Sequence, residues 1–223
     1  MVVLGCVTIG QAPREDLLPE VEAVLGPGVR TVEAGALDGL RMAEIESLRP
    51  HPGQAALATR LADGTPVVVS KEAIVTKVEA AIGRCVAAGA SAILLLCTGQ
   101  FPPLRSPVRV YQPDKLLRAF VDGVVPPQGR LGVLSPLASQ AARAHTKWGA
   151  HGREVVAAIG SPYHGQEAFL QGVAELASQE PDVVLLDCMG FTSEHKQNAR
   201  NVLVDRPVLL PITCIARMIA EVL

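Results

Sequence analysis

The sequence predicts a two-lobed α/β protein in which parallel strands, flanked by helices, converge on one cleft. Short apolar runs alternate with stretches of helical periodicity along almost the whole chain. Hydrophobic residues make up 49% of the chain but aromatic residues only 3%, which indicates an aliphatic core of the kind found in parallel sheets. The length of 223 residues is long for one compact domain and short for two ordinary ones, which favours one two-lobed unit.

The elements follow from apolar runs and from helix start and stop signals. The expected strands lie at residues 2–7, 31–33, 67–70, 92–96, 109–111, 130–134, 155–159, 183–188 and 208–210. The expected helices lie at residues 13–25, 72–88, 115–124, 137–148, 166–177, 193–202 and 215–222, with one short helix within 35–53. Pro13 opens the first helix and Gly89 ends the second as a C-cap. This alternation predicts parallel sheets with right-handed crossovers, and the proline-rich stretch 100–107 reads as a linker between the lobes.

The bulk composition excludes several classes of function. The formal charge of −2 and the absence of a basic stripe argue against a nucleic-acid partner. The apolar runs are too short to span a membrane, and residues 1–10 lack the features of a signal peptide, so a cytoplasmic location is expected. The five cysteines are widely spaced without a C-x-x-C, which supports neither a disulfide framework nor a zinc ribbon. Nucleotide-binding glycine motifs are also missing.

The most informative feature is a short motif that occurs twice in the chain, each time around a cysteine. The strand AILLLCTG ends at Cys97 and Gly99, and the strand VVLLDCMG ends at Cys188 and Gly190. Ligands bind beyond the carboxyl ends of strands in open α/β sheets, so a cysteine there is placed for chemistry. The alternative is that each cysteine fills the core as a small hydrophobe. The repeated pattern favours a function for this pair, whereas the other three cysteines, Cys6, Cys85 and Cys214, are expected to be structural.

Polar residues gather at the same strand ends. Hydroxyl side chains just beyond predicted strands are expected to line one cleft, either as ligand contacts or as helix caps, and these are Thr8, Ser70, Thr98, Ser135 and Thr213. Arg14 and Lys71 are candidate cations for a substrate carboxylate, although each is also explained as a solvated surface residue.

Asp187 is expected to brace its loop rather than to act directly. The spacing of the histidines, His51, His145, His151, His164 and His195, supports no zinc site with the cysteines, although His164 follows a strand end and is a candidate to enter the cleft.

Motifs along nearly the whole chain resemble the AroM family within the aspartate/glutamate (and hydantoin) racemase superfamily. The residues that carry the resemblance are VTIGQAPR (7–14), VSK (69–71), RLGVLSP (130–136), LDCMGF (186–191) and PVLLPIT (207–213). The resemblance implies two pseudo-symmetric lobes, each a parallel sheet flanked by helices, with the active site between them. It assigns residues 1–100 plus 207–223 to the first lobe and 104–206 to the second.

The resemblance also implies a mechanism. Typical members use two cysteines on opposite faces of a substrate, without metal or organic cofactor, and Cys97 and Cys188 occupy those positions here. The substrate-binding residues expected from the motifs and strand ends are Thr8, Gln11, Arg14, Ser70, Lys71, Thr98, Gly99, Ser135, Gly190, Phe191 and Thr213. Some relatives keep one cysteine and catalyse decarboxylation or cis–trans isomerisation instead.

The resulting hypothesis is a cofactor-independent racemase or epimerase that acts on a small carboxylate-bearing molecule by two-cysteine proton transfer. Two alternatives remain open, namely a non-catalytic small-molecule binder or sensor linked to aromatic biosynthesis, and a single-cysteine lyase or decarboxylase. Racemases of this type are often dimers, so a homodimer is a further expectation. No nucleic acid, membrane, metal or cofactor is expected as a partner.

Overall fold

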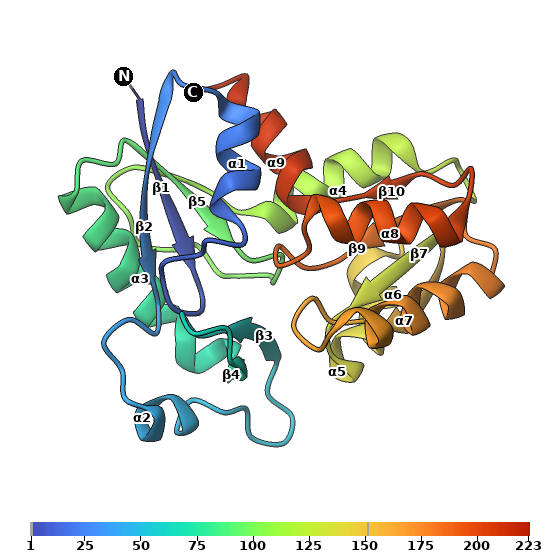
Figure 1. Ribbon diagram of the computed structural model, residues 1–223, viewed down its shortest axis with the longest axis horizontal. Helices are drawn as coiled ribbons and strands as arrows, with labels where there is room; N and C mark the ends of the chain where they lie inside the picture. The colour runs from blue at the N-terminus through green and yellow to red at the C-terminus, as the bar shows by residue number, and fades with distance from the viewer. Residues whose placement is uncertain (1, 151) are drawn as a thin grey trace.

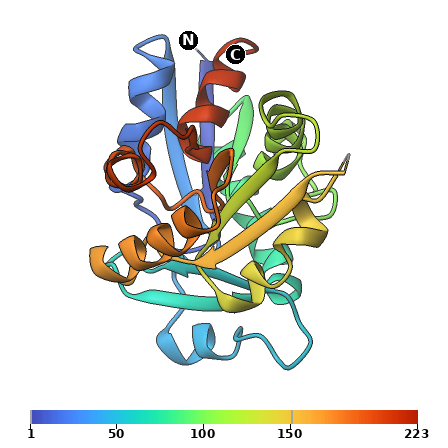
Figure 2. The ribbon, with the colours of Figure 1, turned by 90° about the vertical axis from the view of Figure 1, so that its right-hand side faces the viewer.

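A computed structural model describes residues 2–150 and 152–223 of the protein. Met1 and His151, one of the histidines considered as a zinc ligand, lie outside the described residues. Two lobes lie side by side, and both chain termini lie at the same end of the molecule (Figures 1 and 2). No helix in the described part of the chain is long and apolar enough to cross a membrane.

Each lobe is built on a four-stranded parallel sheet. The strands of the first sheet, in spatial order, are β2 (Val29–Gly35), β1 (Val2–Thr8), β5 (Ala92–Leu96) and β6 (Arg109–Tyr111). Those of the second sheet are β8 (Glu154–Ile159), β7 (Arg130–Ser135), β9 (Val183–Leu186) and β10 (Val208–Leu209). The two orders match strand for strand, so β5 and β9 are equivalent interior strands. This confirms the predicted pair of pseudo-symmetric lobes, each with a parallel sheet.

Helices flank both sheets. Their bounds are α1 (Leu18–Leu25), α2 (Met42–Glu46), α3 (Lys71–Ala87), α4 (Pro113–Val124), α5 (Ala138–Ala141), α6 (Ala144–Trp148), α7 (Gln166–Ser178), α8 (Ser193–Leu203) and α9 (Pro211–Ala220). Helix α3 shows how the sequence sets an element. Ser70 is its N-cap and accepts a hydrogen bond from the Ala73 N–H, and a stripe from Ile74 to Cys85 is buried. This stripe packs on β1 and β2.

Successive side chains of the first sheet point to opposite faces, and both faces are buried. Leu94 and Leu96 of β5 belong to a core shared with α1, α4, α9 and the second lobe. Ile93 and Leu95 belong to a separate core beneath α3. Because successive side chains point to opposite faces, both faces need apolar residues, and β5 is accordingly buried at every position. The first of these cores runs from one lobe into the other and joins them.

Two expected strand assignments are wrong. The closing strand β10 pairs with β9 of the second sheet instead of returning to the first lobe, whereas β6 pairs with β5 of the first sheet. The reason is that the strand following each cysteine loop is laid beside the cysteine strand and satisfies its open hydrogen-bonding edge. Helix α9 nevertheless packs against α1 of the first lobe and against α4.

Three further elements differ from the expectations. The first helix begins at Leu18 rather than at Pro13, because residues 9–17 form a loop around Arg14. The helix expected over 137–148 is divided into α5 and α6, where the Arg143 N–H bonds to Gln140 O in a tighter turn. A hairpin of β3 (Ala56–Arg60) and β4 (Pro66–Ser70) is antiparallel and separate from both sheets. Its turn carries Asp63 and Gly64, with φ of +92° at the glycine, and this dipeptide was the available hairpin signal.

Candidate active site

Cys97 comes one residue after the end of β5, and Cys188 comes two residues after the end of the equivalent interior strand β9. Each sulfur accepts a backbone N–H from the glycine two residues later, at 3.3 Å from Gly99 and at 3.4 Å from Gly190. Both residues are buried, with 8% and 9% of their surface exposed. The repeated sequence motif thus forms a similar turn twice, and in each turn a glycine N–H donates to the cysteine sulfur.

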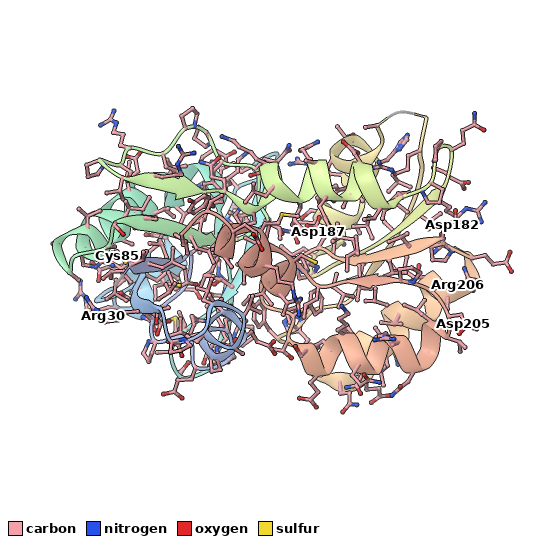
Figure 3. The ribbon with its side chains drawn as sticks, turned by 90° about the horizontal axis from the view of Figure 1, so that it is seen from above. Arg30, Cys85, Asp182, Asp187, Asp205 and Arg206 are labelled. Carbon is pink, nitrogen blue, oxygen red and sulfur yellow. The ribbon has the colours of Figure 1, made fainter. Side chains whose placement is uncertain are left out.

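The two cysteine loops are in direct contact. The Thr98 hydroxyl donates to the backbone carbonyl of Asp187 at 3.2 Å, which joins the residue after one cysteine to the residue before the other. Asp187 lies where the lobes meet, whereas Cys85 lies well away from the junction within the first lobe (Figure 3). The topology therefore brings Cys97 and Cys188 to one interlobe junction.

A cluster of hydrogen-bonded side chains connects the two cysteine loops at this junction. The Lys147 ammonium group of α6 donates to both carboxylate oxygens of Asp187 at 2.8 Å and to Thr98 O at 2.9 Å. The Trp148 indole N–H donates to Asp187 Oδ2 at 2.9 Å. The carboxylate is thus fully partnered, which confirms that Asp187 braces its loop. Lys147 contacts both cysteine loops at once, and no local motif in the sequence indicated it.

Cys188 has a polar environment. The Tyr163 hydroxyl lies 4.0 Å from Cys188 Sγ, and Arg14 Cζ lies 5.9 Å from the centre of the Tyr163 ring. Burial raises the pKa of the Cys188 thiol, whereas the Gly190 N–H, the Tyr163 hydroxyl and Arg14 act to lower this pKa. His164, the neighbour of Tyr163, is exposed. The loop after β8 therefore presents its tyrosine to the cysteine, and the histidine suggested by the sequence lies outside.

Cys97 has a more apolar environment. Burial raises the pKa of its thiol to about 12, and the proximity of Cys188 adds to the rise. The Gly99 N–H and Lys147 oppose that shift. A Cβ built on Gly99 would lie 2.9 Å from Leu57 Cδ2 and 3.3 Å from a ring carbon of Phe101, so a larger residue would require these side chains to shift. The two thiols are therefore equivalent in position but differ in electrostatic surroundings.

Arg14 is buried, and each nitrogen of its guanidinium group donates a hydrogen bond within the chain. Nε and Nη2 bind the two carboxylate oxygens of Asp16 at 2.8 Å each, and Nη1 donates to the Thr8 hydroxyl at 3.1 Å. Burial would raise the pKa of Asp16, but the bonds from Arg14 outweigh it and lower that pKa. The fork expected to receive a substrate carboxylate is thus occupied by a carboxylate of the same chain.

Four other predicted residues have contacts of different kinds. Gln11 ties the loop after β1 to the hairpin, because its amide accepts from the Ala62 N–H at 3.1 Å and donates to Leu37 O at 3.3 Å. Ser135 ends β7 as Thr8 ends β1, and its hydroxyl is buried without a hydrogen-bond partner in the described part of the chain. Thr213 donates to Leu210 O at the start of α9. Phe191 is fully buried, and its ring packs against Phe169 and His195 in the core of the second lobe.

A pocket of about 330 Å³ lies between the lobes, beside the Cys97 loop. Its first-lobe wall includes Leu57, Lys71 and Gly99, and its second-lobe wall comes from α5, α6 and the turn between them. The pocket brings together the predicted residues Lys71, Thr98 and Gly99. It adds Gln140 and Arg143, which the sequence did not single out because their approach to the first lobe depends on how the lobes pack.

The described residues, 2–150 and 152–223, contain no group of three or more His, Cys, Asp or Glu side chains placed to hold a metal. His195 serves the start of α8, since its Nδ1 lies 2.9 Å from the Thr192 hydroxyl. Burial lowers the pKa of this imidazole. The groups close to the two thiols are backbone N–H groups, hydroxyls and cations.

The chain is similar to racemases of known structure. Glutamate racemase from Aquifex pyrophilus is 15% identical with a TM-score of 0.63, and the match covers 100% of this chain and 84% of that one. Allantoin racemase from Klebsiella pneumoniae is 15% identical with a TM-score of 0.64 and coverages of 100% and 87%. Arylmalonate decarboxylase is 14% identical with a TM-score of 0.58 and coverages of 99% and 92%. At such identities the likeness establishes the fold. No curated protein sequence matches the chain.

The family assignment comes from a different comparison, in which the family model described as AroM protein matches residues 4–223. That range includes both cysteine loops and every motif that carries the resemblance. The protein has a racemase-like fold, and it belongs to the AroM family.

Proposed function

We propose that this protein is a cofactor-independent racemase or epimerase that acts on a small carboxylate-bearing molecule through Cys97 and Cys188. The observation that carries the proposal is the equivalence of the two thiols. Each follows the matching interior strand of its sheet, and each accepts the N–H of a glycine two residues later. The contact between Thr98 and Asp187 holds their loops together at the lobe junction.

In the proposed reaction one cysteine acts as a thiolate and the other as a thiol. The thiolate takes the proton from the carbon next to the carboxylate, so the C–H bond breaks and an S–H bond forms. The electron pair of that C–H bond passes into the enolate of the carboxylate. The opposite thiol then donates its proton to the other face of the carbon and becomes a thiolate. The product has the inverted configuration, and no redox step or leaving group is involved.

The site must stabilise both a thiolate and the developing enolate charge. Backbone N–H groups and hydroxyls suit this purpose because they are held in fixed directions. Gly99 and Gly190 supply such N–H groups to the sulfurs. The unpartnered hydroxyl of Ser135 is a further donor at a strand end. Since Tyr163 and Arg14 favour the ionised form of Cys188, we assign Cys188 as the thiolate that starts the reaction.

One observation favours a second candidate, a single-thiol lyase or decarboxylase. The Tyr163 hydroxyl lies beside Cys188 with Arg14 next to the tyrosine ring, whereas Leu57 and Phe101 flank Gly99 in the Cys97 loop. A decarboxylase needs one proton donor to the carbanion left after loss of carbon dioxide. In that case Cys188 alone would carry the reaction, and Cys97 would be a packing residue.

The test measures exchange of the α-hydrogen with deuterated water by NMR over a panel of amino acids, hydantoins and arylmalonates. Two-base catalysis predicts that Cys97→Ser and Cys188→Ser each abolish racemisation, whereas Cys214→Ser, a partly exposed cysteine outside the site, leaves it unchanged. Release of carbon dioxide by the wild type and by Cys97→Ser, but not by Cys188→Ser, would establish the single-thiol reaction instead. Binding of a panel member without any exchange or decarboxylation would identify a non-catalytic binder.

A further inference from the structure

The interlobe pocket carries cations on both walls. Lys71 comes from the first lobe at the start of α3, and Arg143 comes from the second lobe between α5 and α6. Among the ion pairs of the described residues, neither side chain has a partner within 4 Å. Two cations from different lobes therefore border one pocket, and neither is held in an ion pair among the described residues.

The charge of the whole lining is positive. Three basic side chains, Lys71, Arg143 and Lys147, and one carboxylate, Asp187, border the pocket. Lys147 and Asp187 neutralise each other, because the ammonium group contacts both carboxylate oxygens. What remains within the lining is the charge of Lys71 and Arg143. The amino-terminal end of the 17-residue helix α3 lies on the Lys71 side, where its positive partial charge is opposed by Glu72 of the first turn, a residue outside the lining.

The rest of the lining suits a small organic molecule. Leu57, Ala55 and Ala56 provide an apolar wall. Gln140 donates its amide N–H to Ala56 O across the lobe boundary at 3.3 Å, and its carbonyl oxygen has no partner among the described residues. A volume of about 330 Å³ lies at the lower end of the range for small-molecule sites and exceeds what a lone inorganic ion needs.

The pocket borders the Cys97 loop directly. Gly99 forms part of its wall, and the N–H of the same Gly99 donates to Cys97 Sγ. A ligand that fills the pocket therefore lies against the loop that carries one of the two thiols.

We propose that this pocket binds a carboxylate or phosphate group of an organic acid between Lys71 and Arg143. If the chain is the isomerase proposed above, on which this part of the inference rests, the pocket holds a second anionic group of the substrate, set away from the reacting carbon. The substrate class is then an acid with two anionic groups. Such a ligand would contact both lobes and hold them together.

The chain contains a built-in reporter for this site. Trp148 is the single tryptophan, and Lys147 Nζ lies 4.8 Å from the centre of its ring while also lining the pocket. Titrations followed by Trp148 fluorescence and by calorimetry would use glutarate, inorganic phosphate and butyrate as probes. We expect glutarate or phosphate to bind and butyrate to bind at least about tenfold more weakly, since one charged contact is lost. Preference for glutarate or for phosphate identifies the anion that the pocket takes.

Variants of Lys71 and Arg143 test whether these two side chains bind the anion. Lys71→Met and Arg143→Met should each weaken binding by about tenfold or more. Lys71→Arg and Arg143→Lys keep the charge and should restore most of the affinity. Lys115→Met and Arg217→Met, two exposed cations outside the pocket, are the matched controls and should leave the affinity unchanged. Failure of every probe to bind, or binding that is insensitive to Lys71→Met and Arg143→Met, would overturn the proposal.

The double variant Cys97→Ser/Cys188→Ser separates this inference from the proposed function. It should bind glutarate or phosphate with wild-type affinity, because neither thiol lines the pocket. Anion binding without α-hydrogen exchange in the wild type would uphold the pocket and reject the isomerase. Exchange without anion binding would uphold the isomerase and reject the pocket.

Discussion

The Lys147 ammonium group donates a hydrogen bond to each carboxylate oxygen of Asp187, both at 2.8 Å. The side chains are 16% and 6% exposed, so the pair is largely shielded from water. Through Thr98 O, the same ammonium group reaches the loop of the other cysteine. The relative position of Cys97 and Cys188 thus depends on a residue that belongs to neither loop.

Lys147→Met should destabilise the protein strongly. Among the described residues it leaves the buried Asp187 carboxylate with only the Trp148 N–H as a side-chain donor, and breaking a buried ion pair typically costs about 3 kcal/mol or more. Urea unfolding of the single variants and of Lys147→Met/Asp187→Asn measures the effect. The double variant should be more stable than Lys147→Met, because its amide carries no unpaired charge. Additive effects of the two changes would show that the pair is not coupled.

Gly190→Ala should displace Tyr163 from its place beside Cys188. A Cβ at position 190 would lie 2.2 Å from the Tyr163 hydroxyl oxygen, so the ring must move. We expect a loss of about 1–3 kcal/mol in the free energy of unfolding and a change in Cys188 reactivity. Gly83→Ala is the control, since a Cβ there meets no atom within 4 Å and alanine favours the α3 helix by about 0.5–1 kcal/mol. Equal effects of the two changes would contradict the crowding at Gly190.

Tyr163→Phe should slow the alkylation of Cys188 at neutral pH. Burial raises the pKa of that thiol and the tyrosine hydroxyl opposes the rise, so its removal leaves less thiolate. A weak hydrogen bond of this kind corresponds to a change of about two- to fivefold in rate. Mass spectrometry after iodoacetamide treatment reports Cys188 and Cys97 separately, and Cys97 serves as the internal control. Because phenylalanine keeps the ring, the rate plateau at high pH should not change, and a lowered plateau would indicate altered access instead.

The Cys97 thiol should make the stability of the protein depend on alkaline pH. Burial raises its pKa from the ordinary value of 9.0 to about 12, so the folded chain keeps this proton when the unfolded chain has lost it. The contribution is constant below about pH 9 and is then lost at about 1.4 kcal/mol per pH unit up to about pH 12. The difference in unfolding free energy between the wild type and Cys97→Ala, measured from pH 7 to pH 11, checks this. A difference that stays constant with pH would refute the burial of the thiol.

Local sequence patterns predicted much of the fold. The apolar runs that became β1, β5, β7 and β9, and the stripe that became α3, are set by neighbouring residues along the chain, and all of them appear close to the expected bounds. The hairpin of β3 and β4 was missed because its first strand, ALATR, has only three apolar residues, two of them alanines, before Thr59 and Arg60. The fourth strand of each sheet was assigned to the wrong lobe, because β6 and β10 are only three and two residues long and carry no signal for their partner.

The candidate site was likewise predicted only in part from the sequence. The sequence by itself determined that two cysteines stand at the ends of apolar strands, each with a glycine two residues later, because a strand, its end and the next residues form one local pattern. Only the tertiary structure decided that Asp16 occupies the fork of Arg14, that Tyr163 rather than His164 faces Cys188, and that Lys147 fastens the junction. Thr98 and Asp187 are 89 residues apart, and Lys147 and Asp187 are 40 apart. Contacts over such separations are set by the packing of the two lobes around a shared core, which no local periodicity records.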